Sequence, residues 1–182
     1  MWPSDMEKRI QTVASLHTRS FSAHLDNVLL KNGQVARRLK VDHPEAAAII
    51  PFISEGEILL VRQYRYALQK ETLEIPAGKL DPGESPDACV RRELREETGY
   101  DAGAIDFLYT YAPAIGYSNE LIHIFRGRGL KRTGELTDQI EIDAVERMSL
   151  EKIRALVKEG IILDGKTLLA LSMLGLLKPL LL

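Results

Sequence analysis

The clearest chemistry in this sequence lies in an acidic run over residues 78–100. Glu93, Glu96 and Glu97 are spaced i, i+3 and i+4, so in a helix their carboxylates share one face. Three like charges repel one another there; a solvated helix surface tolerates this, and a bound cation explains it better. Carboxylate clusters suit hard divalent ions, and Mg²⁺ is typically held by a few carboxylates together with substrate phosphates. The run therefore indicates metal-assisted chemistry on a phosphate compound.

Local signals predict the helix that positions these carboxylates. Ser85 is a suitable N-cap, Pro86 suits the first helical position, and Asp87 complements the positive helix end. Gly99 is the expected C-terminal stop, because glycine readily adopts the left-handed conformation that ends many helices. The single cysteine, Cys89, falls inside this helix, where we expect a packed apolar side chain rather than a nucleophile.

Most of the other predicted elements are strands joined by tight turns. Asn32-Gly33 is a strong hairpin turn because both positions tolerate positive φ, and Ser149 and Asp164 cap two C-terminal helices. Residues 1–20 are expected to form an extension with weak helical character. Strands are predicted over residues 21–30, 35–41, 46–52, 57–64, 72–75, 107–111, 121–125 and 141–147. Strands outnumber helices, which predicts the α/β class with helices on the faces of a mixed sheet.

The composition is that of one ordinary globular domain. The chain has 182 residues, of which 27% are charged and 45% apolar, and its net charge is −2. No basic block resembles a nucleic-acid footprint, so we expect no nucleic-acid partner. The N-terminus lacks the apolar core of a signal peptide. The apolar stretch 167–182 is short for a bilayer and is interrupted by Pro179, which favours a core or dimer-facing helix. With one cysteine, which fits a reducing cytosol, we expect a cytoplasmic protein without a membrane partner.

The acidic run, GKLDPGESPDACVRRELREETGY, resembles the Nudix box. That pattern sets a glycine, a glutamate, Arg-Glu, an aliphatic residue, Glu-Glu and a second glycine at fixed spacings. Every charged and glycine position matches, and only Tyr100 departs, by filling an aliphatic position with an aromatic ring. The matching residues are Gly78, Glu84, Arg92, Glu93, Leu94, Glu96, Glu97 and Gly99. A match of this length is far more specific than a lone glycine pattern.

Three further segments resemble the ADP-ribose pyrophosphatase branch of that family, namely LLVRQYRYALQKETLEIPAG, PAIGYSNE and DGKTLLAL. The resemblance covers most of residues 35–177 and implies hydrolysis of ADP-ribose to AMP and ribose 5-phosphate. It also implies a Nudix-type α/β/α sandwich, a homodimer, and one to three Mg²⁺ ions, or Mn²⁺ ions, as cofactor. Residues 1–44 would be an N-terminal extension and β-hairpin that serve dimerisation, and residues 45–182 the hydrolase domain.

The resemblance implies metal ligands within the box. These are the backbone carbonyl of Ala77, the carboxylates of Glu93 and Glu97, Glu96 as a completing or bridging ligand, and Glu84 through water. Gly78 would let the backbone turn close to the ion. Arg92 is expected to orient Glu84, because a guanidinium matches a carboxylate in two-point geometry. Glu93, Glu97 and Arg92 thus form the predicted catalytic set of the box.

Glu120 completes that catalytic set. It follows a loop rich in glycine, serine and asparagine, and in the resembling branch a glutamate on this loop acts as catalytic base or positions the water. The alternative is a solvated loop carboxylate. Close relatives usually carry Ser-Pro-Gly before this glutamate, whereas this chain has Pro113-Ala114-Ile115-Gly116, a difference that bears on substrate fit.

Three arginines and one tyrosine are candidates for substrate binding. The resemblance favours Arg65 as the diphosphate contact, while Arg62 is either a second contact or a structural ion-pair partner. Arg38 would reach the partner subunit's substrate or remain an exposed strand residue, and Tyr117 is the ring we expect on adenine. The histidines have no metal-ligand spacing and are interpreted as structural or exposed: His17, His24, His43 and His123.

The box addresses a diphosphate and its metal rather than the base, so other functions stay open. One alternative is a Nudix diphosphatase for GDP-mannose, NADH, a dinucleoside polyphosphate or a damaged nucleoside triphosphate. Another is a nucleotide-sensing Nudix domain that binds without hydrolysis. Such domains often lose box carboxylates or carry an added nucleic-acid-binding module, whereas in this chain every box carboxylate is present.

Overall fold

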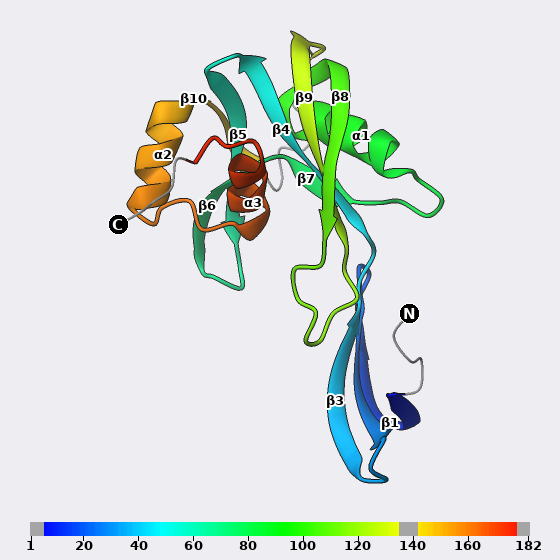
Figure 1. Ribbon diagram of the computed structural model, residues 1–182. Helices are drawn as coiled ribbons and strands as arrows, with labels where there is room; N and C mark the ends of the chain where they lie inside the picture. Colours follow the sequence, from blue (N-terminus) through cyan, green and yellow to red (C-terminus); the bar gives the residue numbers. More distant parts are fainter. Residues whose placement is uncertain (1–5, 135–141, 178–182) are drawn as a thin grey trace. The chain divides into compact units, whose positions relative to one another are not determined.

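The computed structural model describes residues 6–134 and 142–177 (Figure 1). Residues up to Glu45 form one compact unit with Ala112–Leu121, which we call the N-terminal unit. Ala46–Tyr111 and the described residues from Ile122 onward form the second, which we call the core unit. The elements are, in chain order, β1 (Glu7–His17), β2 (Ser22–Leu30), β3 (Val35–Asp42), β4 (Ala46–Ser54), β5 (Glu57–Arg65), β6 (Lys70–Glu74), β7 (Ala77–Lys79), α1 (Pro86–Thr98), β8 (Tyr100–Tyr111), β9 (Ile122–Arg132), β10 (Ile142–Ser149), α2 (Leu150–Lys158) and α3 (Gly165–Met173).

The core unit is built on a seven-stranded mixed sheet. Its main strand order is β10-β5-β4-β9-β8, with β6 paired to β5 and β7 paired to β4. Strands β4 and β9 run parallel, and the other paired strands of this sheet run antiparallel. The mixed sheet predicted from the sequence is therefore confirmed.

Strand β4 shows why helices cover both faces of this sheet. Ala46, Ala48 and Ile50 pack into one apolar cluster with residues of α2 and α3. Ala47 and Ile49, which point to the opposite face, pack with residues of α1 (Figure 1). A strand buried on both faces is expected to be a continuous apolar run, as the sequence Ala-Ala-Ala-Ile-Ile is. The predicted α/β/α sandwich is confirmed.

The helices begin and end where local signals predicted. Ser85 caps α1 by accepting a hydrogen bond from the Ala88 amide at 3.3 Å, and Gly99 ends the helix at φ 72°. Ser149 and Asp164 cap α2 and α3 in the same way. Helix α3 buries Ala170 and Leu171 completely, so this apolar segment packs in the core. No helix in the described part of the chain is long and apolar enough to cross a membrane.

The N-terminal unit departs from the prediction. The hairpin is confirmed as β2 and β3, but the segment expected to be a weakly helical extension is strand β1, which pairs antiparallel with β2. The hydroxyl of Thr12 donates to the buried carboxylate of Asp26 at 2.7 Å, a contact between strands that local propensity cannot reveal. Strands β8 and β9 are also longer than predicted, because they pair along most of their length. Glu141, the first residue of the strand predicted at 141–147, and Pro179 lie outside the described residues.

Candidate active site

Gly78 and Glu93 form the tightest contact at the box. A Cβ atom placed on Gly78 would lie 1.9 Å from Oε1 and 2.0 Å from Cδ of Glu93. The carboxylate of Glu93, on α1, therefore lies directly against the backbone of β7, and only glycine leaves it that space. The sequence analysis expected Gly78 to let the backbone turn close to an ion; in the structure the Glu93 carboxylate lies against this backbone, and the metal role stays a prediction.

Arg92 lies among three of the box carboxylates. Its Nε and Nη2 donate to the two carboxylate oxygens of Glu84 at 3.0 and 2.9 Å, which is the two-point pairing expected from the sequence. Nη1 donates to Glu93 at 2.6 Å and to Glu96 at 3.1 Å. Nη2 also donates to the carbonyl of Lys79, which ties the arginine to β7.

These contacts set the charge of each carboxylate. The hydrogen bonds from Arg92 lower the pKa of Glu84 to about 2, although partial burial opposes them. Burial raises the pKa of Glu93, and Arg92 counteracts that effect. Glu97 is 5% exposed, and its Oε2 accepts a hydrogen bond from the amide of Ala77 at 3.1 Å. Two box glutamates, Glu93 and Glu97, are thus held against β7 by backbone contacts.

The box has the donors that a hard divalent ion requires. Within residues 6–134 and 142–177, no three side chains of His, Cys, Asp or Glu are already arranged around a metal position. In this structure Arg92 forms ion pairs with Glu84, Glu93 and Glu96. The oxygen-only donor set, with the Glu93 carboxylate lying against the backbone at Gly78, fits such an ion.

Cys89 lies in an environment that does not favour a nucleophile. Burial, together with the charges of Glu93 and Glu84, raises the pKa of its thiol to about 12. The side chain is fully buried in the apolar cluster beneath α1. The interpretation of Cys89 as a packed apolar residue agrees with this environment.

Arg65 and Arg62 belong to two separate networks. Arg65 donates from Nε and Nη2 to the two carboxylate oxygens of Glu74 at 2.7 and 2.5 Å. Arg62 donates from Nε to Glu146 on β10 at 2.6 Å and reaches Glu71 at 3.4 Å. The structural alternative for Arg62, an ion pair, is therefore present, and the diphosphate role of each arginine stays a prediction.

Sequence reasoning missed the partners of Glu74. Lys166, at the start of α3, is 8% exposed and forms ion pairs with Glu74 and with Asp164. Thr72 donates to Glu74 at 2.6 Å, and the hydroxyl of Thr167 accepts the amide of Ile75 at 2.9 Å. The segments LEIPAG and DGKTLLAL carried the family resemblance, which was the one signal pointing to these residues.

Within the N-terminal unit, the loop that carries Glu120 is tied to the end of β3. The amide of Val41 donates to the carbonyl of Tyr117 at 2.6 Å, and the amide of Asn119 donates to the carbonyl of Val41 at 3.2 Å. Nδ1 of His43 lies 3.5 Å from Oε1 of Glu120. His43 was interpreted as structural or exposed. The spacing of the histidines in the sequence did not reveal that His43 contacts Glu120.

Arg38 and Tyr117 are the other predicted site residues in the N-terminal unit. Arg38 donates from Nε and Nη2 to the carboxylate of Glu7 on β1, at 3.0 and 2.6 Å. Tyr117 is 55% exposed, so its ring is accessible. The structure describes these two residues and Glu120 in one unit and the box residues in the other.

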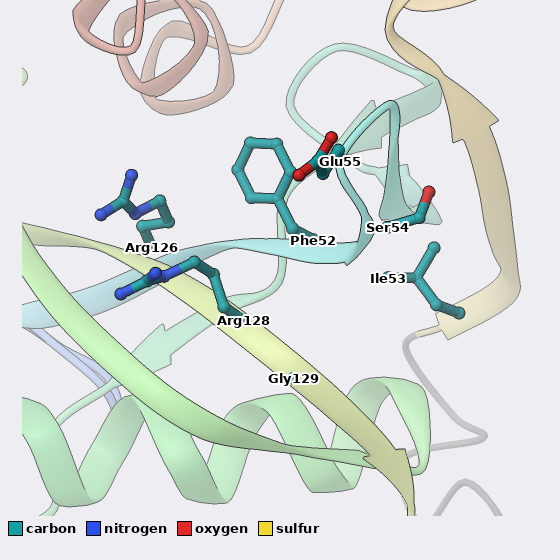
Figure 2. Close-up of a pocket in the computed structure, with 7 residues that line it drawn as sticks. All are labelled: Phe52, Ile53, Ser54, Glu55, Arg126, Arg128 and Gly129. Atoms are coloured by element: carbon teal, nitrogen blue, oxygen red, sulfur yellow. The ribbon is translucent and has the colours of Figure 1, made fainter.

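A pocket of about 350 Å³ lies elsewhere on the core unit (Figure 2). It is lined by Phe52, Ile53, Ser54, Glu55, Arg126, Arg128 and Gly129. Arg126 and Arg128 both pair with Asp106 at 2.9 Å, so one of their two positive charges is compensated. None of the residues predicted for the site lines this pocket.

Comparisons with known proteins place the chain in a family. The family model described as NUDIX domain matches residues 42–169, which is most of the chain. The chain therefore belongs to the NUDIX family, and it is a Nudix hydrolase.

The chain is similar to the methanol dehydrogenase activator of Bacillus methanolicus, with 38% identity over 93% of each chain. It is similar to the ADP-ribose pyrophosphatase of Bacillus subtilis strain 168, with 34% identity over 93% of each chain. A solved structure described as an ADP compounds hydrolase shares the fold, with a TM-score of 0.78 and 23% identity over 95% of each chain.

Proposed function

We propose that this Nudix hydrolase splits the diphosphate of ADP-ribose, or of a related ADP-sugar, into AMP and ribose 5-phosphate. The observation that carries the hydrolytic role is the packing of the complete box, with Glu93 against Gly78 and Glu97 on the Ala77 amide. The similarity to the Bacillus subtilis enzyme along 93% of both chains supports the choice of ADP-ribose.

The cofactor in this proposal is Mg²⁺ or Mn²⁺, in one to three ions. Its ligands would be the carbonyl of Ala77 and the carboxylates of Glu93, Glu96 and Glu97, with Glu84 joining through water. A bound ion offsets the negative charge of the diphosphate and lowers the pKa of a coordinated water. Arg92 would keep Glu84 in place and compensate the acidic cluster through its ion pairs with Glu84, Glu93 and Glu96.

The remaining predicted residues act on the substrate in this proposal. Arg65, whose side chain is 41% exposed, would bind the diphosphate, and Arg62 would serve as a second contact if its ion pairs open. Glu120 would be the catalytic base, or the group that positions the attacking water. Tyr117 would stack on adenine, and Arg38 would reach the substrate of a partner subunit.

We further propose a homodimer formed through the N-terminal sheet. The strand registers place four large apolar side chains on one face of this sheet, each at least 40% exposed. They are Leu16, Leu29, Val35 and Leu39. Several exposed apolar side chains on one face of a small sheet are typical of an interaction surface, although the pair of Asn27 and Arg37 lies on the same face. We expect the enzyme to act in the reducing cytosol, which the lone buried cysteine fits.

A substrate panel with product identification tests the proposed function. The purified chain is incubated with Mg²⁺ and, separately, ADP-ribose, GDP-mannose, NADH and a dinucleoside polyphosphate, and the products are identified by mass spectrometry. We expect AMP and ribose 5-phosphate from ADP-ribose at the highest kcat/KM. Absence of turnover of every compound, with tight nucleotide binding that persists in Mg²⁺, would instead establish a sensing domain.

The relative named methanol dehydrogenase activator favours one second candidate function, namely an effect on the activity of a dehydrogenase. At 38% identity over 93% of each chain, it is more similar to this chain than the Bacillus subtilis enzyme is. Adding the wild-type chain and the Glu97→Gln variant to a bacterial methanol dehydrogenase and measuring its turnover tests this. If dehydrogenase turnover rises with the wild-type chain and not with the Glu97→Gln variant, the effect depends on the Nudix site.

A further inference from the structure

A series of largely buried ion pairs joins β6, the strand that precedes the box segment, to helix α3. Glu74, at the end of β6, is 3% exposed and forms an ion pair with Lys166 of α3. Lys166 also lies 3.1 Å from Asp164, which caps α3 by accepting the amide of Thr167. Charged side chains are seldom buried unless they are paired, and in this network each buried charge has a partner of opposite sign.

Arg65 is the member of this series of ion pairs that faces solvent. Both oxygens of Glu74 accept hydrogen bonds from Arg65, and Oε1 also accepts the hydroxyl of Thr72. The Arg65 side chain is 41% exposed, whereas that of Lys166 is 9% exposed. The buried members therefore hold the guanidinium in one orientation while leaving it accessible to a ligand.

The segment that follows Glu74 is joined by hydrogen bonds to the box. The amide of Ile75 donates to the hydroxyl of Thr167 on α3, and two residues later the amide of Ala77 donates to Glu97 on α1. The hydrogen bond to Glu74 raises the pKa of the Arg65 guanidinium most, and the charge of Glu97 makes a smaller contribution in the same direction. Residues 74–77 thus connect this series of ion pairs to the carboxylates proposed to hold the metal.

Lys166 decides the local balance of charge. Arg65 and Lys166 carry two positive charges, and Glu74 and Asp164 carry two negative charges, so the group is neutral. Without Lys166 the group would carry one net negative charge beside the place where Arg65 meets its ligand. That charge would repel a diphosphate anion, and Arg65 would be neutralised more completely by Glu74.

We propose that Lys166 is a positioning residue for the substrate diphosphate, because with Glu74 and Asp164 it fixes Arg65 and keeps this group of four charges neutral. This proposal rests on the proposed function, since it takes Arg65 to be the diphosphate contact. Lys166 acts through Arg65 and is not itself a ligand, because it lies buried beneath Glu74. The motif DGKTLLAL thereby acquires a role in substrate affinity.

A double-mutant cycle tests this proposal. The probe is an ADP-ribose analogue with a methylene group between its two phosphorus atoms, titrated calorimetrically in Mg²⁺ into four proteins: wild type, Lys166→Met, Arg65→Ala and the double variant. We expect Lys166→Met to weaken binding about tenfold and Arg65→Ala to weaken it at least as much. The double variant should bind no more weakly than Arg65→Ala alone, because residues that act as a unit are not additive.

Two further variants serve as controls. Lys166→Arg keeps the charge and should retain most of the affinity, whereas a role in packing alone would not distinguish methionine from arginine in this way. Arg147→Met removes an ion pair with Glu57 on the same sheet and should leave binding unchanged. If Lys166→Met fails to fold, Thr72→Val, which removes one hydrogen bond to Glu74, takes its place in the cycle with a smaller expected loss.

The different failures are distinguishable. If wild-type protein does not bind the analogue, the proposed function fails and the role of Lys166 fails with it. If the wild type binds but Arg65→Ala does not weaken binding, Arg65 is not the diphosphate contact and the proposal for Lys166 is overturned. If both single variants weaken binding and their effects add in the double variant, Lys166 acts independently of Arg65, which also overturns it.

Discussion

At the scale of single residues, the site depends on how closely a carboxylate can approach a backbone. Glu93 occupies the volume that any side chain at position 78 would need. Glycine is therefore required at this position for space rather than for a special backbone conformation, since its φ lies outside the left-handed region that Gly83 and Gly99 adopt. The placement of Glu93 follows directly from the residue at position 78.

Replacing Gly78 by alanine should abolish most activity without unfolding the protein. The new Cβ would displace the Glu93 carboxylate, which is the flexible end of a side chain, so the backbone is spared. We expect a fall in kcat/KM of about a hundredfold, since misplacing a catalytic group by about 1 Å has effects of that order. Steady-state kinetics and thermal unfolding measure the two quantities.

Gly56→Ala is the matched control for that variant, because a Cβ at Gly56 meets nothing within 4 Å. It should retain wild-type kcat/KM. Wild-type kinetics in Gly78→Ala would show that activity does not require Glu93 to lie against β7, and would contradict the prediction.

Cys89 should be unreactive in the folded protein. With its pKa raised to about 12 by burial and by the charges of Glu93 and Glu84, it carries almost no thiolate at pH 8. Intact-mass spectrometry after treatment with iodoacetamide should show no adduct on native protein and one adduct after denaturation. Rapid alkylation of the native protein would contradict the buried environment of this thiol.

At the scale of elements, the link between β6 and α3 should make stability depend on pH. Burial alone would raise the pKa of Glu74, but the hydrogen bond from Arg65 and the charge of Lys166 outweigh it and lower the pKa from 4.5 to about 2. A carboxylate with a lowered pKa stabilises the fold fully above pH 4.5, and this contribution is lost as the pH falls from 4.5 toward 2.

The Glu74→Gln variant tests that dependence. At pH 7 the wild type should exceed the variant in free energy of unfolding, and the difference should shrink by about 3 kcal/mol as the pH falls through this window. Urea unfolding at several pH values measures it. A difference that stays constant between about pH 6 and about pH 2.5 would show that Glu74 has the same pKa in the folded and unfolded chain.

Elements whose signals are local were predictable, and those defined by distant partners were not. The caps of α1, α2 and α3 were predicted because each cap residue bonds to an amide three residues away. Strand β1 was missed because its pairing with β2 and the contact between Thr12 and Asp26 decide its conformation. In the site, the box was predictable from its spacing, whereas the ion pair of Lys166 with Glu74 joins residues 92 positions apart.

At the scale of the whole molecule, the apolar face of the N-terminal sheet predicts self-association. Leu39→Glu places a charge in the middle of that face and should convert a dimer to a monomer, because burying an unpaired carboxylate is costly. Light scattering coupled to size-exclusion chromatography gives the mass. Gln34→Glu, in the exposed turn before β3, is the control and should remain dimeric, and a monomeric wild type would rule out the interface.

Coordination of divalent ions by Glu93 and Glu97 at the diphosphate of a nucleotide sugar is the step on which the proposed function depends. A crystal structure with Mg²⁺ and the methylene analogue of ADP-ribose would show the ligands of each ion directly. We predict that carboxylate oxygens of both residues lie about 2.1 Å from a metal ion that also contacts the diphosphate. Ions bound at the diphosphate with no carboxylate oxygen of Glu93 or Glu97 coordinated to any of them would contradict the proposed mechanism.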